Sequence, residues 1–161
     1  MDSQEQAVHR FAEKVRALCA VLENPPGDRD EALRLIYERL VVVYAGVLEL
    51  KDEYEGMSEE LLGDEYRVSS DECLSINGNV QRVVGNRAFY RSNPDPIFPE
   101  RKENGEWEVS VGWLPGDLDE IYHDLMPGLR ALEAGIVPLA DVRWQWRAFP
   151  CFGHWGLHAL E

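Results

Sequence analysis

The strongest constraint on the fold is the spacing of apolar side chains between Asp117 and Ala134. They recur every three or four residues, at Leu118, Ile121, Tyr122, Leu125, Leu129 and Leu132. This spacing is typical of an α-helix that buries one stripe, and it predicts a helix over residues 117–134. Gly135 supplies the stop signal. Pro127 removes one hydrogen bond inside such a helix, so a kink is predicted there.

The chain beyond that helix follows a second helical pattern. Between Leu139 and Glu161, one side of a helix would carry Trp146, Phe149, Gly153, Leu157 and Leu160. Pro150 interrupts the pattern, and each glycine weakens a helix by about 1 kcal/mol relative to alanine. Two shorter helices that break near Phe149 and one bent helix fit the sequence equally well. Residues 116–161 are therefore predicted to form a C-terminal helix pair.

The N-terminal third predicts a helical hairpin over residues 4–48. Ser3-x-x-Gln6 is a capping-box pattern, and a helix is expected from about Gln4 to Glu23. The sequence Asn24-Pro25-Pro26-Gly27 ends it, and Asp28 or Asp30 can cap the next helix. The buried stripe expected for that second helix is Leu33, Ile36, Tyr37, Leu40, Val43, Tyr44 and Val47.

The middle of the chain, residues 49–115, is predicted to be acidic and irregular. In residues 49–72, ten acidic side chains accompany only Lys51 and Arg67. This acidic segment is either a solvated loop with a short helix near residues 58–62 or a docking surface for a basic partner. A helix over residues 69–84 is disfavoured because Asn77-Gly78-Asn79 forms a turn signal in its middle.

A short β-hairpin is expected near residues 98–113. Trp107, Val109, Val111 and Trp113 alternate with small or polar residues, which is strand periodicity. A turn at Asn104-Gly105 would pair this strand with residues 88–91 or with residues 98–102. Several prolines between residues 94 and 115 mark an irregular connection.

The C-terminal third carries a resemblance. The segment D-L-D-E-I-Y-H-D-L-M-P-G-L-R-A-L-E-A-G is followed by W-Q-W-R and then by H-W-G-L-H-A-L. Over residues 116–160 this resembles a family of bacterial domains of unknown function that carry a D-L-x-D-I-Y-x-D-L-x-x-G-L helix, W-x-W-R and H-W-G-x-H. The resemblance implies an all-α domain and no particular activity. With the helical patterns, it predicts a mainly helical bundle forming a single domain over residues 1–161.

Composition limits the classes of function. The chain has 161 residues, 45% of them hydrophobic, which is typical of a globular domain. Its formal net charge of -14 disfavours binding to nucleic acids and to anionic membranes. Cys19, Cys73 and Cys151 are odd in number and form no C-x-x-C motif, as expected of reduced thiols. With no apolar signal segment at the N-terminus, we expect a soluble cytoplasmic protein.

One set of residues suggests metal chemistry. His154 and His158 have the i, i+4 spacing of zinc ligands, and Asp117, Glu120 or Asp124 could add a carboxylate. These residues define the alternative function, a metal-dependent hydrolase. The H-E-x-x-H motif is absent, however, and Glu120-x-x-His123 lacks the second copy that a di-iron bundle needs. The histidines and acids are therefore interpreted first as hydrogen-bonded neighbours at the edge of the core, and no cofactor is expected.

The Trp144-x-Trp146-Arg147 motif suggests either a structural or a binding role for the arginine. Arg147 could bridge to Asp124 or Glu120 and tie the last helices together, or it could clamp an anion or a peptide. A thiol nucleophile at Cys151 beside His154 would be a further option, supported by sequence proximity alone.

The favoured function is that of a protein-binding module. A small acidic scaffold without a catalytic signature suits an immunity or antitoxin-like inhibitor that is steered onto a basic protein by charge. No residue is assigned a catalytic role. The residues expected to bind the partner are Glu53, Glu55, Glu59, Glu60, Trp144, Arg147 and Trp155.

Overall fold

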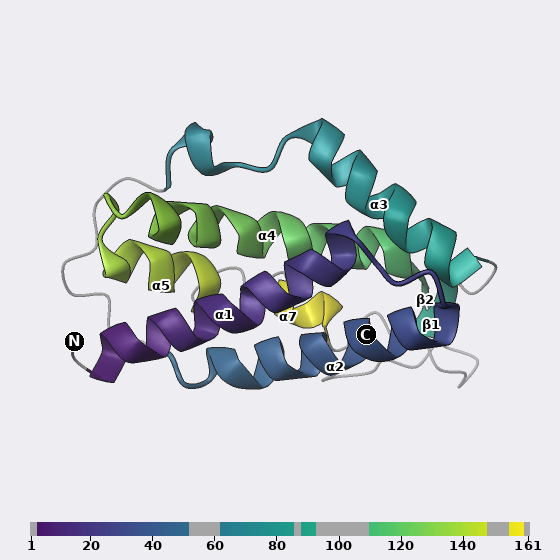
Figure 1. Cartoon of the computed structure of the whole chain (residues 1–161), viewed down its shortest axis with the longest axis horizontal. Helices are drawn as coiled ribbons and strands as arrows, with labels where there is room; N and C mark the ends of the chain where they lie inside the picture. Colours follow the sequence, from purple (N-terminus) through teal and green to yellow (C-terminus); the bar gives the residue numbers. More distant parts are fainter. Residues whose placement is uncertain (1–2, 52–61, 86–87, 93–109, 148–154, 160–161) are drawn as a thin grey trace, which may run out of the picture.

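The computed structural model in Figure 1 shows a bundle of helices with one small β-hairpin at an end. It describes residues 3–51, 62–85, 88–92, 110–147 and 155–159. The elements, in chain order, are α1 Ser3–Glu23, α2 Arg29–Val47, the 3-10 helix η1 Asp64–Tyr66, α3 Ser70–Val84, β1 Phe89–Ser92, β2 Ser110–Trp113, α4 Leu114–Ala134, α5 Leu139–Arg147 and α7 Trp155–His158. The predicted class, all-α with a short hairpin, is confirmed.

The N-terminal helical hairpin forms as predicted. Helix α1 buries the apolar side expected of it, including Phe11, Val15 and Leu18. Asp28 is the cap of α2, where its side chain accepts a hydrogen bond from the Glu31 amide at 2.8 Å. Helix α1 contacts α2, α3, α4 and α5, so it lies at the centre of the bundle (Figure 1).

The turn predicted at Asn77-Gly78-Asn79 is wrong, because these residues lie inside helix α3. The helix runs unbroken from Ser70 to Val84, starting from a capping box in which Ser69 and Glu72 bond reciprocally. The side chain of Asn79 donates to the carbonyl oxygen of Glu23, the last residue of α1, at 2.7 Å. Burial of Ile76, Val80 and Val84 adds to this contact, so tertiary packing outweighs the local turn preference.

The β-hairpin uses the earlier of the two predicted pairings. Strands β1 and β2 are antiparallel, with Phe89 opposite Trp113, and the Leu114 amide donates to the Ala88 carbonyl at 2.8 Å. Residues 93–109, with the predicted Asn104-Gly105 turn, lie outside the described residues. Strand β2 passes directly into α4, which therefore begins at Leu114, three residues before the predicted start, with Pro115 in its first turn.

Helix α4 connects most of the bundle. It contacts α1, α3, α5 and α7, and it ends where predicted, at Gly135, which has a left-handed backbone with φ 68°. The helix continues through Pro127, which is buried. The kink expected there stays a prediction.

The described part of the C-terminal region contains the short helices α5 and α7, and the break near Phe149, one of the two sequence alternatives, stays a prediction. Residues 148–154 between them lie outside the described residues. Buried side chains of α1, α2, α3, α4, α5 and α7 share one hydrophobic core. None of the described helices has both the length and the apolar composition needed to cross a membrane.

Candidate functional site

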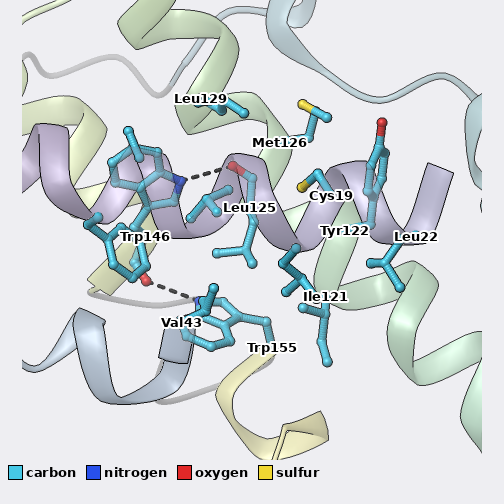
Figure 2. Packing of buried hydrophobic residues seen from close by; sticks show 14 of the residues in the cluster. Cys19, Leu22, Val43, Ile121, Tyr122, Leu125, Met126, Leu129, Trp146 and Trp155 are labelled. Atoms are coloured by element: carbon cyan, nitrogen blue, oxygen red, sulfur yellow. Dashed lines mark hydrogen bonds between the residues drawn. The ribbon is translucent and has the colours of Figure 1, made fainter. Parts of the chain in front are cut away.

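Two tryptophans of the C-terminal region lie in the core. The indole nitrogen of Trp146 donates to the Leu125 carbonyl of α4 at 2.9 Å, and that of Trp155 donates to the Trp146 carbonyl at 3.0 Å (Figure 2). Both side chains are 0% exposed. The prediction that Trp155 faces a partner is therefore wrong, since its apolar ring and its only donor are both satisfied inside the protein.

The neighbours of these tryptophans come from the N-terminal hairpin. Phe11 meets Trp146 edge to face with ring centroids 5.0 Å apart, and Tyr44 meets Trp155 in the same way at 6.3 Å. Such contacts add to the stabilisation from area burial. The two tryptophans thus join the two ends of the chain.

The remaining predicted binding residues of this region lie on α5. Trp144 is half-buried. Arg147 is also half-buried, and its Nη1 donates to the carbonyl of Val47, the last residue of α2, at 3.0 Å. This contact gives Arg147 a structural role with a partner that the sequence did not indicate, because it ties α5 to the end of α2 by satisfying a terminal helix carbonyl. The predicted bridge to Asp124 or Glu120 stays a prediction.

A small cavity lies beside α4 where η1 and α5 approach it. It measures about 130 Å³ and is lined by Leu62, Gly63, Arg67, His123, Asp124, Pro127 and Gln145. His123 Nδ1 lies 3.6 Å from an oxygen of Asp124, and Gln145 Nε2 donates to the Asp124 carbonyl at 3.3 Å. The hydrogen bond to Asp124 is the largest cause that raises the pKa of His123, while partial burial acts against it.

Those predicted metal ligands that the structure describes do not gather into a metal site. Asp117 accepts a hydrogen bond from the Tyr90 hydroxyl at 2.6 Å, and Glu120 is exposed. Within the described ranges, no group of three His, Cys, Asp or Glu side chains could hold a metal ion. His154 and the side chain of His158 lie outside those ranges, so the predicted histidine pair stays a prediction.

The two described thiols are poor nucleophiles. Burial raises the pKa of Cys19 to about 12. Desolvation, with the charge of Asp119 second, raises the pKa of Cys73 to about 11. A thiol with such a pKa is almost fully protonated at neutral pH and reacts slowly. Cys151 lies outside the described residues.

The acidic segment is described only at its ends. Glu53, Glu55, Glu59 and Glu60 lie outside the described residues, so their role in binding stays a prediction. At one end, Glu49 accepts from Lys14 Nζ at 2.9 Å and also lies 3.5 Å from Arg10. At the other end, Glu72 caps α3 and forms an ion pair with Arg130 of α4. These two terminal acids are thus part of the scaffold.

The sequence analysis missed an exposed apolar surface on α2. Tyr37, Val41 and Leu48 are 68%, 48% and 61% exposed, and their spacing places them on one side of the helix, with Leu48 at its C-cap. We call these three residues the α2 outer face. Tyr37 was expected in the buried stripe, but the buried side of α2 carries Ala32, Ile36, Val43 and Val47 instead.

A signal for this surface was present in the sequence. Residues 40–48 are nine uncharged residues in succession, LVVVYAGVL, and they cover all sides of a helix. A helix of the N-terminal hairpin can turn only part of its circumference toward α1 and the core, so some of these side chains had to face outward.

The fold defines the class of the protein: a helical bundle with a small hairpin. The chain belongs to the family described as Domain of unknown function (DUF5063), whose sequence profile matches residues 2–161. The predicted resemblance to a family of unknown function is confirmed and extends over nearly the whole chain.

A solved structure shows the same fold. The crystal structure of protein BF1032 from Bacteroides fragilis matches with a TM-score of 0.68 and 17% sequence identity, over 99% of this chain and 90% of that chain. At this identity the likeness concerns the fold alone. The search of curated proteins gave no significant match.

Proposed function

We propose that this protein is a protein-binding module that docks a basic partner through the α2 outer face. An immunity or antitoxin-like inhibitor is the specific form of this function that we favour. The observation that carries the proposal is the exposure of Tyr37, Val41 and Leu48 on one side of a helix whose other side is in the core. Apolar side chains grouped on a surface mark interaction sites, whereas single ones do not.

The composition of the α2 outer face suits a protein rather than a small ligand. Tyr37 supplies a large ring with a polar tip, as the anchor residues of protein interfaces do. The helix presents the three side chains on a convex surface, and a groove or flat face of another protein can cover such a surface. The exposed pair Arg34–Glu38, with atoms 2.7 Å apart, borders it and provides a polar rim.

The charge of the chain supports a basic partner. A formal net charge of -14 generates a field that attracts positive proteins and repels acidic ones before contact. Long-range attraction of this kind raises the rate of association, and short-range apolar contacts then hold the complex. The predicted acids Glu53, Glu55, Glu59 and Glu60 would act in the first step and the α2 outer face in the second.

The first experiment compares three immobilised proteins as baits in a lysate of the source cell. These are the wild type, a variant with Tyr37→Ser, Val41→Ser and Leu48→Ser, and a control with Leu74→Ser and Ile136→Ser. The control removes apolar side chains that are even more exposed, at 71% and 80%, on other parts of the molecule. A basic protein retained by the wild type and the control but lost with the α2 variant supports the proposal.

The second experiment measures association kinetics with the partner so identified. Raising the salt concentration to about 0.15 M, where the screening length is about 8 Å, should lower the on-rate. At low salt, the variant with Glu53, Glu55, Glu59 and Glu60 changed to Gln should also have a lower on-rate than the wild type. An on-rate that ignores both changes argues against steering by these acids. If ultracentrifugation shows instead that the wild type self-associates through the α2 outer face, its occupant is a second copy and the proposal fails.

A further inference from the structure

A second cavity lies where the turn between α1 and α2 meets the end of α3. Its volume is about 290 Å³, and it is lined by Pro25, Pro26, Gly27, Arg29, Arg82 and Val83. This volume is about ten times the roughly 30 Å³ that a water molecule occupies in the liquid. The cavity therefore has room for a phosphate group together with part of the molecule that carries it.

Two arginines from different helices reach this cavity, and both are held in place. Arg29 Nη2 donates to the carbonyl oxygen of Val84. Arg82 Nη2 donates to the side-chain oxygen of Asn79 at 3.0 Å, and Asn79 in turn donates to the Glu23 carbonyl. The guanidinium groups are thus positioned by neutral oxygens, a carbonyl and a side-chain amide.

Neither arginine of this cavity has an acidic partner among the described residues. Five other described arginines form an ion pair with a carboxylate: Arg10, Arg16, Arg34, Arg67 and Arg130. Among the described residues, neither Arg29 nor Arg82 does so. In a chain with 30 acidic and 16 basic residues, two arginines without a carboxylate beside one cavity are unexpected on charge alone.

The hydrogen bonding of Arg29 and its neighbours also indicates that the cavity can hold an anion. Its Nε is buried and has no hydrogen-bond partner among the described residues, and buried unsatisfied donors commonly mark the place of a water or an ion. Two acids are adjacent to Arg29 in sequence, and one of them, Asp28, is engaged, since its carboxylate accepts from the Glu31 amide. Asp30, the residue that follows Arg29, has an exposed side chain.

We propose that Arg29 and Arg82 form a binding site for a phosphate group. A carboxylate has two oxygens, which a single guanidinium fork satisfies, whereas phosphate offers enough oxygens to engage two forks from different directions. Pro25 and Pro26 also line the cavity, and their fixed φ angles restrict the backbone there, so little ordering is needed on binding. The phosphate group can come from the free ion or from a phosphate monoester.

The test is a titration of the full chain with inorganic phosphate at constant ionic strength, followed by NMR at the amides of Gly27 and Val83. Arg82→Gln removes an exposed guanidinium and should weaken binding at least about tenfold, as expected for loss of a charge-assisted bidentate contact. Arg29→Lys keeps the charge but loses the fork, and it should also weaken binding. The matched control is Arg39→Gln, an exposed arginine of α2 outside the cavity.

The outcomes separate the site from general attraction by charge. Unchanged binding in Arg82→Gln, or an equal loss in Arg39→Gln, would overturn the proposal. Acetate that binds as tightly as phosphate would overturn the assignment to phosphate. O-phosphoserine that binds more tightly than inorganic phosphate supports a monoester as the ligand, and equal binding supports the free ion. Thermal unfolding of each variant verifies that the fold is retained.

Discussion

A Cβ atom placed on Gly128 would lie 2.4 Å from Nε1 of Trp146. Helix α4 therefore approaches the indole of α5 more closely than any residue but glycine allows. The same indole nitrogen bonds the Leu125 carbonyl one turn earlier in α4. The ring is consequently bonded to the helix at Leu125, packed directly against it at Gly128 and fully buried.

Gly128→Ala should therefore destabilise the protein, although alanine is the better helix former. We expect a loss of about 1–3 kcal/mol in the free energy of unfolding, as for overpacking of a core. Urea unfolding followed by circular dichroism measures it. The matched control is Gly78→Ala in α3, where a Cβ meets nothing within 4 Å. There the change should stabilise by about 0.5–1 kcal/mol, and an equal effect at both glycines would contradict the close contact.

Glu72 should contribute to stability in a manner that depends on pH. Hydrogen bonds from the Ser69 backbone and hydroxyl and the ion pair with Arg130 hold the pKa of Glu72 below its usual value. Because the folded pKa is the lower one, the stabilisation is present above the unfolded pKa near 4.5 and is lost as pH falls through the folded value.

Glu72→Gln should accordingly lower the free energy of unfolding at pH 7 by about 1 kcal/mol, a value reduced for partial exposure. Its stability should also fall less steeply than that of the wild type as pH drops below 4.5. Urea unfolding at pH 7, 5, 4 and 3.5 tests both points. Glu13→Gln on the exposed side of α1 is the control, and an identical profile for the two variants would rule out the proposed role of Glu72.

The titration of His123 provides a third test. Its pKa is raised above 6.5, first by the hydrogen bond to Asp124 and then by the charges of Asp124, Asp119 and Glu120. Since the folded pKa is the higher one, the stabilisation is fully present below pH 6.5 and disappears as pH rises through the folded value. Asp124→Asn should lower the pKa of His123 measured by NMR, and Glu120→Gln should lower it less. The reverse order would contradict the observed pairing.

The reactivity of Cys73 provides a fourth test. With its pKa raised from 9.0 to about 11, Cys73 has about a hundredfold less thiolate at pH 8 than an ordinary thiol. In a Cys151→Ser background, a disulfide reagent should therefore label the folded protein much more slowly than the urea-unfolded chain. Asp119→Asn should accelerate labelling of Cys73 because it removes a negative charge. Labelling of folded and unfolded protein at similar rates would contradict both burial and charge.

The sequence predicted the helices with a single apolar stripe accurately. Helix α1 was expected from about Gln4 to Glu23 and runs from Ser3 to Glu23, since its stripe and its stop are both local signals. Helix α4 was expected to end before Gly135 and does so. Its start was predicted three residues too late, because strand β2 continues directly into the first turn at Leu114. Pairing between strands that are far apart in sequence produces no local sequence pattern.

Other features depend on contacts that no local pattern encodes. The turn signal at Asn77-Gly78 is overridden because Asn79 bonds the end of α1. The orientation of α2 was misjudged because apolar residues surround it on every side, and only packing against α1 decides which ones are buried. Trp155 was assigned to the surface, but its indole reaches the Trp146 carbonyl. The Arg29 and Arg82 cavity joins residues that are 53 positions apart, and neither belongs to a motif.

The last residue of α1 has a consequence for synthesis of the chain. The Glu23 carbonyl accepts from Asn79, 56 residues later, and the Glu23 carboxylate accepts from the Tyr122 hydroxyl at 2.7 Å, 99 residues later. At roughly 5–20 residues per second, the ribosome adds Asn79 roughly 3–11 s after Glu23. Until then the end of α1 has neither of these two partners. The nascent protein closes there only when most of its length has been translated.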